Sequence, residues 1–322
     1  MNNRQIWVDM LKGYGILVVT LGHAGVDFLI EKHIYSYHMF LFFFISGYLF
    51  TGKRNLKETL CHKTNTILIP FIAWDVISSV IGAVINNLSF KSFISTLFIL
   101  KGNLCFNAPI WFLLVLFFTE IIYVAVKKYA TDWMIVVTSV LLFVMVGTIK
   151  LPLKINLIPL ALFSYALGDL YKLYKNRGGY KQNLLLLQLA LCSITFGMFL
   201  NERISYTAGI FGNMFYCIVA AITGVMFFCI LFQWLFEKSK YNFLCYLGRN
   251  SFSIMVMQYY FFRFYNPIAK RLFGIEDLWH TENTLKAVFM SAVTIGLILI
   301  IVELCRNCTS GKFKKVAKFF GI

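Results

Sequence analysis

The residues best suited to chemistry in this chain lie close to its N-terminus. Lys12 and His23 are eleven residues apart, close to three turns of an α-helix, so their side chains share one helix face. Asp9, three residues before Lys12, is expected on that face as well. Because imidazole titrates near physiological pH, His23 is a candidate general base. Two alternatives stay open: a histidine that only hydrogen-bonds a neighbouring helix, and an interfacial ion pair of Asp9 with Lys12.

The sequence that must position these residues is strongly apolar. The chain has 322 residues, of which 59% are hydrophobic and 14% charged, and its mean hydropathy is +0.74. Soluble domains are about 45–50% apolar and about 25% charged. One globular core cannot bury this much apolar surface, so we expect an all-α, polytopic bundle of transmembrane helices. Charged and titratable groups are costly inside a membrane, which makes them functional candidates.

Apolar stretches recur at intervals, and each is near the roughly 17–25 residues that a bilayer requires. Ten spans are expected, at 11–30, 34–52, 66–87, 108–126, 132–149, 155–172, 183–201, 212–236, 250–265 and 285–305. The ninth is short because residues 248–251 (GRNS) predict a break followed by a helix N-cap. The longest non-helical connections are expected at 88–107 and 266–284.

The distribution of basic residues predicts the orientation. The 30 Lys and Arg divide 20 to 10 between the two sides of such a bundle, so both termini are expected in the cytoplasm. Residues 1–305 then form one transmembrane domain, and the basic stretch 306–322 a cytoplasmic tail on the membrane surface. The polar start, which leads directly into a full-length span, gives no indication of a cleavable signal peptide.

The net charge and the cysteine positions limit which ligands and cross-links the sequence predicts. The net charge of +16 does not predict nucleic acid binding, because the basic residues lie in short loops, where they orient the bundle and attract anionic ligands or lipids. Most of the eight cysteines lie within apolar spans and do not predict a disulfide framework. Cys305 and Cys308 form a lone CxxC pair without a second pair nearby, so no metal site is predicted.

A second stretch with polar residues follows the first helix. Residues 35–48 read YSYHMFLFFFISGY. The Phe run is consistent with lipid contact or core packing, whereas His38 and the Ser46–Gly47 pair are not explained by packing alone. A plain interfacial histidine is the alternative for His38.

Together, residues 9–23 and 35–48 resemble the start of the family 3 acyltransferases, multispan bacterial enzymes that O-acylate cell-surface carbohydrates. The closest resemblance is to the fucose 4-O-acetylase-like branch. Weaker matches are Lys63 with LIPF at 68–71 and Trp74, PIWFL at 109–113, and LGRNSFS at 247–253. Two positions depart from the family pattern. Thr66 stands where a second basic residue is common, and Gln258 stands where the late helix often carries a histidine, so more weight falls on His23.

The resemblance implies transfer of an acyl group, usually acetyl from acetyl-CoA, to a sugar hydroxyl in the bacterial inner membrane. It assigns His23 as general base or transient acyl acceptor, with Lys12 and Asp9 fixing its helix face. The residues expected to bind the phosphates of acetyl-CoA are Lys53, Arg54 and Lys63. Those expected to bind the carbohydrate acceptor are His38, Ser46, Trp111, Asn250, Ser251 and Gln258. No metal and no nucleic acid are implied, and the lipid bilayer is the surrounding partner.

Two other functions compete with this one. A transporter or flippase is the generic expectation for ten spans, and it should show broken helices at corresponding positions of two halves. A non-catalytic scaffold of a polysaccharide-assembly complex predicts that Lys12 and His23 are replaceable.

Overall fold

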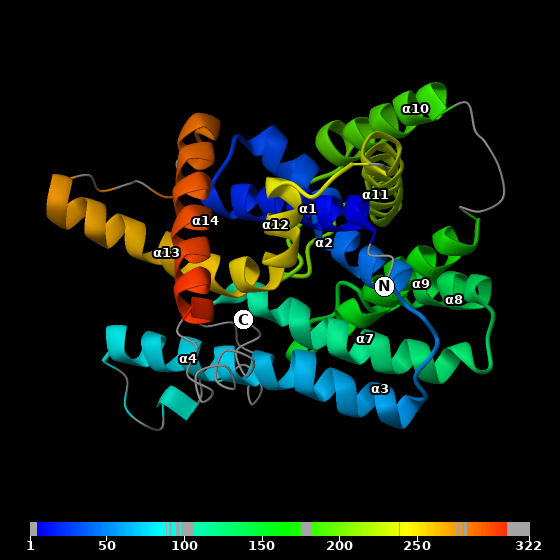
Figure 1. Cartoon of the computed structure of the whole chain (residues 1–322), viewed down its shortest axis with the longest axis horizontal. Helices are drawn as coiled ribbons and strands as arrows, with labels where there is room; N and C mark the ends of the chain where they lie inside the picture. Colours follow the sequence, from blue (N-terminus) through cyan, green and yellow to red (C-terminus); the bar gives the residue numbers. More distant parts are fainter. Residues whose placement is uncertain are drawn as a thin grey trace.

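The computed structural model describes residues 5–87, 89, 92–94, 97, 106–174, 182–237, 239–274, 276, 279 and 282–307. Over these residues the chain is helical, apart from its connections and one isolated bridge between Ser205 and Ile210. The all-α expectation is therefore confirmed. The helices pack around the first two, α1 (Ile6–Ala24) and α2 (Phe28–Tyr48), which lie in the middle of the bundle (Figure 1).

The remaining helices surround this pair. They are α3 (Leu56–Lys63), which a π-helical turn at Thr64–Leu68 joins to α4 (Ile69–Ile85), α7 (Trp111–Lys127), α8 (Asp132–Val146), α9 (Ile158–Tyr174), α10 (Gln182–Ile194), α11 (Met214–Phe236), α12 (Phe243–Arg249), α13 (Ser251–Phe273) and α14 (Thr284–Asn307). Short 3-10 turns at Ala108–Ile110 and Pro152–Leu157 lead into α7 and α9, and a π-helical turn at Thr195–Leu200 ends α10.

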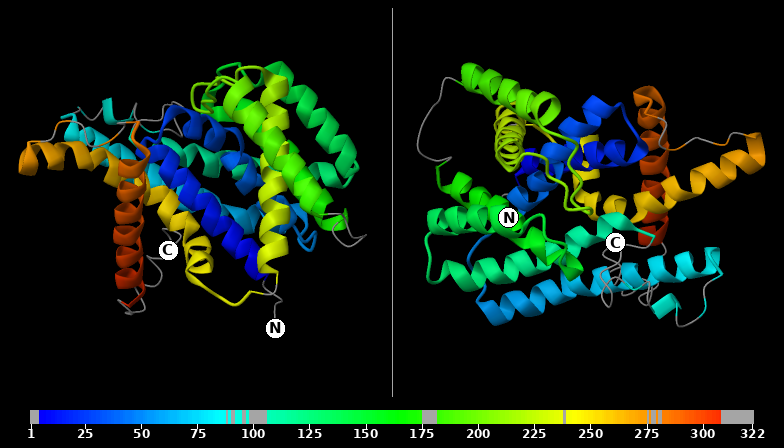
Figure 2. Two further views of the ribbon diagram at one scale, coloured as in Figure 1. Left: turned by 90° about the horizontal axis from the view of Figure 1, so that it is seen from above. Right: turned by 180° about the vertical axis from the view of Figure 1, so that it is seen from behind.

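Five helical stretches of the described residues are long and apolar enough to cross a bilayer, which marks the chain as a membrane protein. They are Leu56–Ile85, Ala108–Lys127, Pro152–Leu173, Met214–Phe236 and Thr284–Asn307. All ten expected spans overlap helices, but the count of ten crossings stays a prediction. In the left view of Figure 2, the start of α1 and the end of α14 lie on the same side of the bundle. That this side is cytoplasmic also stays a prediction.

Several expected boundaries were wrong for local reasons. The first helix ends at Ala24 rather than at 30, because Gly25 adopts the left-handed conformation with φ 93°. The third begins at Leu56 rather than at 66, because Asn55 and Glu58 form a capping box there. The expected loop at 266–284 is helical as far as Phe273, and α13 continues through Pro267. Most of 88–107, and 308–322 of the expected tail, lie outside the described residues.

The predicted break at 248–251 is confirmed, since α12 ends at Arg249 and α13 begins at Ser251. The Asn250 side chain does not cap α13. Its amide nitrogen donates to the Tyr246 carbonyl at 2.8 Å, and its oxygen accepts from Arg306 at 2.7 Å. Asn250 therefore ties the break to the end of α14.

Glycines allow α2 and α9 to cross at close range. A Cβ at Gly47 would lie 1.9 Å from the Tyr165 carbonyl oxygen, and one at Gly168 would lie 2.1 Å from that of Phe44. Small residues at a helix crossing permit this approach in membranes. The close crossing supplies the packing reason for Gly47 that the sequence did not reveal. Phe40, Phe43 and Phe44 of the same helix are buried in the core.

We expect Gly47→Ala to lower the free energy of unfolding of the purified protein by about 1–3 kcal/mol, because overpacking a tight contact costs this much. The melting temperature should fall accordingly. The added Cβ would overlap backbone atoms of Tyr165, which cannot move aside by a side-chain rotation. Gly296→Ala in α14 is the matched control, since a Cβ at that position would meet no described atom within 4 Å beyond the adjacent backbone of its own helix and alanine favours a helix. Equal melting temperatures for the two variants would contradict this account of the crossing.

Candidate active site

Three adjoining cavities lie along one face of α1. The histidine cavity, of about 210 Å³, includes His23 in its lining, and the basic cavity, of about 290 Å³, includes Lys12. The connecting cavity, of about 160 Å³, shares Ile16 with the first and Lys12 with the second. The shared-face prediction for Lys12 and His23 is therefore confirmed, because both line this row.

The end of α1 is held firmly where His23 lies. The His23 Nδ1 atom is 3.2 Å from the Tyr35 hydroxyl, and its backbone carbonyl accepts a hydrogen bond of 2.7 Å from Trp279 Nε1. The Tyr259 ring packs edge-on against the imidazole, with ring centres 5.7 Å apart. These contacts come from α2, α13 and the segment after α13, so tertiary packing sets the position of the imidazole.

His38 lines the same cavity from α2 and is only 2% exposed. Its Nδ1 lies 2.8 Å from the Ile34 carbonyl oxygen. The Tyr35 ring packs against both histidines, with ring centres 6.2 Å from His23 and 4.9 Å from His38. The fold thus brings two imidazoles and a tyrosine hydroxyl to one cavity.

The rest of the histidine cavity combines an aromatic wall with a charged pair. The Trp111 ring stacks on Tyr206 at 6.0 Å and 27°, which places the predicted Trp111 on the cavity wall. Arg203 donates to the buried Glu31 carboxylate at 2.6 Å. Aromatic faces and paired polar groups suit a ligand that has both apolar and hydrogen-bonding surfaces.

The basic cavity is lined by Lys12, Lys53, Arg54, Lys63 and Glu120 among others. Lys63 and the buried Glu120 carboxylate are 2.7 Å apart, so the one acid of this lining is paired with one of its four cations. Lys53 and Arg54 are exposed. This excess of positive charge favours an anionic ligand.

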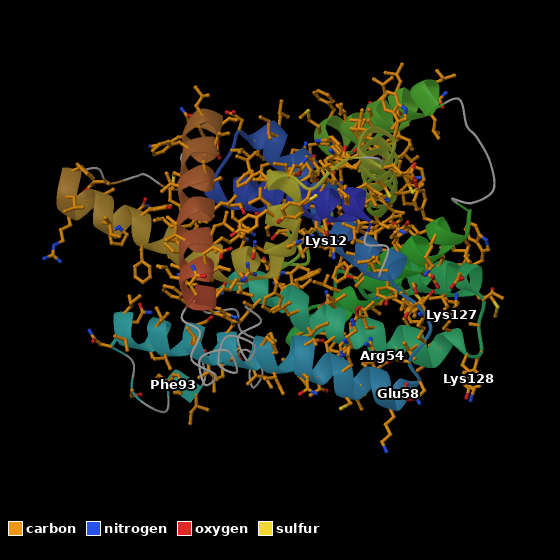
Figure 3. All side chains as sticks on the ribbon, viewed as in Figure 1. Lys12, Arg54, Glu58, Phe93, Lys127 and Lys128 are labelled. Atoms are coloured by element: carbon orange, nitrogen blue, oxygen red, sulfur yellow. The ribbon has the colours of Figure 1, made fainter. Side chains whose placement is uncertain are left out.

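The loop between α2 and α3 forms part of the wall of the basic cavity. Helix α9 holds this loop in place, because Lys172 donates a hydrogen bond to the Phe50 carbonyl. Lys12 lies near the middle of the bundle in Figure 3, whereas Arg54 lies beside α3. The cavity therefore leads from the α3 loop toward the centre of the molecule.

Two further predicted residues line the row of cavities. Ser46 lines both the basic and the connecting cavity, and its hydroxyl donates to the Phe42 carbonyl at 2.9 Å. Ser251, at the start of α13, lines the connecting cavity. Together with Lys12, they are the polar groups of its otherwise apolar lining.

Three predicted residues lie away from these cavities. The Asp9 carboxylate is 3.8 Å from Arg249 of α12, and α12 packs against the start of α1. Asn250 joins α12 to α14, as described above. Gln258 is fully buried, and neither of its amide atoms has a hydrogen-bond partner among the described residues.

Other residues of the site were not among the predicted ones. Tyr35 lies within the stretch that drew attention to His38, and Glu120 is a carboxylate inside an apolar helix, so both carried a signal. Arg203 carried none, because its partner Glu31 is 172 residues away in the chain. No group of three His, Cys, Asp or Glu side chains suited to a metal occurs in the part of the chain that the structure describes.

The fold and these cavities define a helical membrane protein with a charged internal site. The family model described as "Acyltransferase domain", acyltransferase family 3, matches residues 5–303, and the chain belongs to this family. The predicted family is thereby confirmed, and its members are acyltransferases. The fucose 4-O-acetylase-like branch stays a prediction.

Two curated relatives are similar to parts of the chain. The nodulation protein NolL of Sinorhizobium fredii is 27% identical over 186 residues, which cover 51% of this chain and 47% of NolL. The NolL of Mesorhizobium japonicum is 33% identical over 87 residues, or 23% of each chain. The chain thus matches about half the length of the first relative and less of the second. No solved structure matches it.

Proposed function

We propose that this membrane acyltransferase moves an acetyl or other acyl group from acetyl-CoA or a related acyl-CoA to a hydroxyl of a cell-surface carbohydrate or its precursor, in the bacterial inner membrane. The observation that carries the proposal is the row of three cavities along α1, with cations at one end and histidines at the other. A donor and an acceptor that enter from opposite ends would meet along this row.

The basic cavity suits the donor. Coenzyme A carries several phosphate charges, and the cations Lys53, Arg54 and Lys63 can form charge-assisted hydrogen bonds with them. The connecting cavity has an apolar lining around Lys12, which suits the uncharged arm that carries the thioester. Along α1, His23 lies about 16 Å beyond Lys12 at 1.5 Å per residue.

The histidine cavity suits the acceptor. A sugar ring can stack on the wall that Trp111 and Tyr206 form, and its hydroxyls can bond to the Glu31–Arg203 pair. Among the polar groups there, we assign to His23 the action on the hydroxyl that reacts, because it is the residue that the sequence proposes as base.

The chemistry requires a base, because a sugar hydroxyl is a poor nucleophile at neutral pH. In the proposed reaction, His23 takes the hydroxyl proton while the oxygen attacks the thioester carbonyl carbon. The carbon–sulfur bond then breaks, and coenzyme A leaves with the proton. In the alternative, His23 first accepts the acyl group itself and then passes it on.

We expect saturating acetyl-CoA to raise the melting temperature of the detergent-purified protein, because a ligand that binds only the folded state stabilises it. Arg54→Ala should weaken binding about tenfold or more, since a charge-assisted hydrogen bond is worth about 1.5–3 kcal/mol. Lys57→Ala is the matched control, because Lys57 is an exposed cation of the same segment that does not line the three cavities.

Either of two results would oppose this proposal. A folded wild type that acetyl-CoA does not stabilise would reject this donor and favour the transporter alternative. Equal weakening by Arg54→Ala and Lys57→Ala would move the donor site away from the basic cavity.

A further inference from the structure

The connecting cavity and the histidine cavity meet at apolar residues from four different helices. The described residues that line both cavities are Ile16 of α1, Phe42 of α2, Phe112 of α7 and Met255 of α13. We propose that these four residues form an apolar collar, which admits the acyl group of the donor into the histidine cavity and limits that group to a short chain. This inference rests on the proposed acyl transfer and adds the residues that select the acyl group.

The collar lies between the two ends of the proposed site. Ile16 follows Lys12 by four residues and precedes His23 by seven, or about one and two turns of α1, so all three share one helix face. The residues shared by the connecting and basic cavities differ in kind, because they include the polar Lys12 and Ser46. The lining therefore changes from polar to apolar about one turn beyond Lys12.

The chemistry of the collar decides which part of each substrate can enter it. Its side chains offer no hydrogen-bond donor and, as acceptor, only the weakly accepting sulfur of Met255. Phosphates and sugar hydroxyls would lose their hydrogen bonds to water there without replacement, which costs free energy, whereas an acyl chain would not. We therefore expect the phosphates on the Lys12 side, the sugar on the His23 side, and the acyl group between them.

Three members of the collar are held firmly by their neighbours. The Phe42 ring packs against Phe112, with ring centres 6.1 Å apart, and a Cβ on Gly15 of α1 would lie 3.0 Å from Phe42 Cζ. Phe112 also packs against Phe43, with ring centres 4.7 Å apart. Ile16 is only 1% exposed, and a β-branched side chain has little freedom at χ1. These three residues therefore form fixed walls.

Met255 is the adjustable member of the collar. It is only partly buried, and methionine is unbranched, with three rotatable bonds. Because the other three walls are fixed, the length of the Met255 side chain sets the room left for an acyl group. A shorter side chain should admit a longer acyl group, since one methylene changes the discrimination of an apolar pocket by about 10–200-fold.

The test compares three ligands of the detergent-purified protein: acetyl-CoA, butyryl-CoA and free coenzyme A. The concentration of each that gives half-maximal thermal stabilisation measures its binding. We expect the wild type to bind acetyl-CoA more tightly than butyryl-CoA. Met255→Ala should shift the ratio of the two affinities toward butyryl-CoA by about tenfold or more, and it should leave the binding of free coenzyme A unchanged.

Met257→Ala is the matched control. Met257 is a partly buried methionine of the same helix that does not line the three cavities, so its loss should leave the ratio unchanged. The melting temperature without ligand shows whether Met255→Ala is folded, and Met255→Val is the second variant if it is not.

Free coenzyme A separates failure of the collar from failure of the proposed function. If the ligands stabilise the wild type but Met255→Ala and Met257→Ala have the same ratio, the collar is overturned and the donor site stands. Equal binding of acetyl-CoA and butyryl-CoA by the wild type would also overturn the size limit alone. A folded wild type that none of the three ligands stabilises would overturn the proposed function as well.

Discussion

His23→Ala is expected to reduce acyl transfer by about 10²–10⁴-fold, the range that a positioned acid or base contributes, while the protein still folds. The imidazole lines a cavity, so its removal enlarges a space that already exists. The bond from Trp279 goes to the His23 backbone carbonyl and survives the substitution. The measurement is acetyl-CoA consumption at saturating acceptor, together with the melting temperature.

The matched control for this variant is His33→Ala. It removes an imidazole from the neighbouring helix α2, and His33 is partly buried and hydrogen-bonded to Ser193. Full turnover by a folded His23→Ala protein would defeat the catalytic role of His23. If Lys12 were also replaceable, the scaffold alternative would be favoured.

Lys12→Met is expected to have the second largest effect, a loss of roughly 10–100-fold in turnover at low acetyl-CoA concentration. Lys12 lines both the basic and the connecting cavity, so its charge lies on the route that we propose for the donor. A hydrogen bond to a charged group contributes about 1.5–3 kcal/mol, and each 1.4 kcal/mol is a factor of ten. Methionine keeps a similar length and removes the charge.

Lys12→Arg separates the charge from the shape of the side chain. It should retain most of the binding if the positive charge is what matters, since arginine also binds phosphate groups. The measurement is the acetyl-CoA concentration that gives half-maximal stabilisation and half-maximal turnover. Unchanged values for Lys12→Met would show that the donor does not pass Lys12.

The local features of the site were readable from the sequence because they depend on short-range geometry. The helical period placed Lys12 and His23 on one face, and the structure shows both in one row of cavities. Composition predicted an all-helical membrane protein, and the residues at 248–251 predicted the break between α12 and α13. The three cations predicted to bind the donor, Lys53, Arg54 and Lys63, also line one cavity, because they come from one short segment.

Only the tertiary structure decided which side chains share the site. A helix that is apolar on all sides gives no signal of which face points inward. The sequence therefore did not reveal that Asp9 lies beside Arg249 of α12, or that Gln258 is buried away from the cavities. The Glu31–Arg203 pair joins residues 172 positions apart. The sequence by itself predicted a helical membrane protein with Lys12 and His23 on one face of its first helix. Packing between helices determined which other side chains line the cavities beside that face.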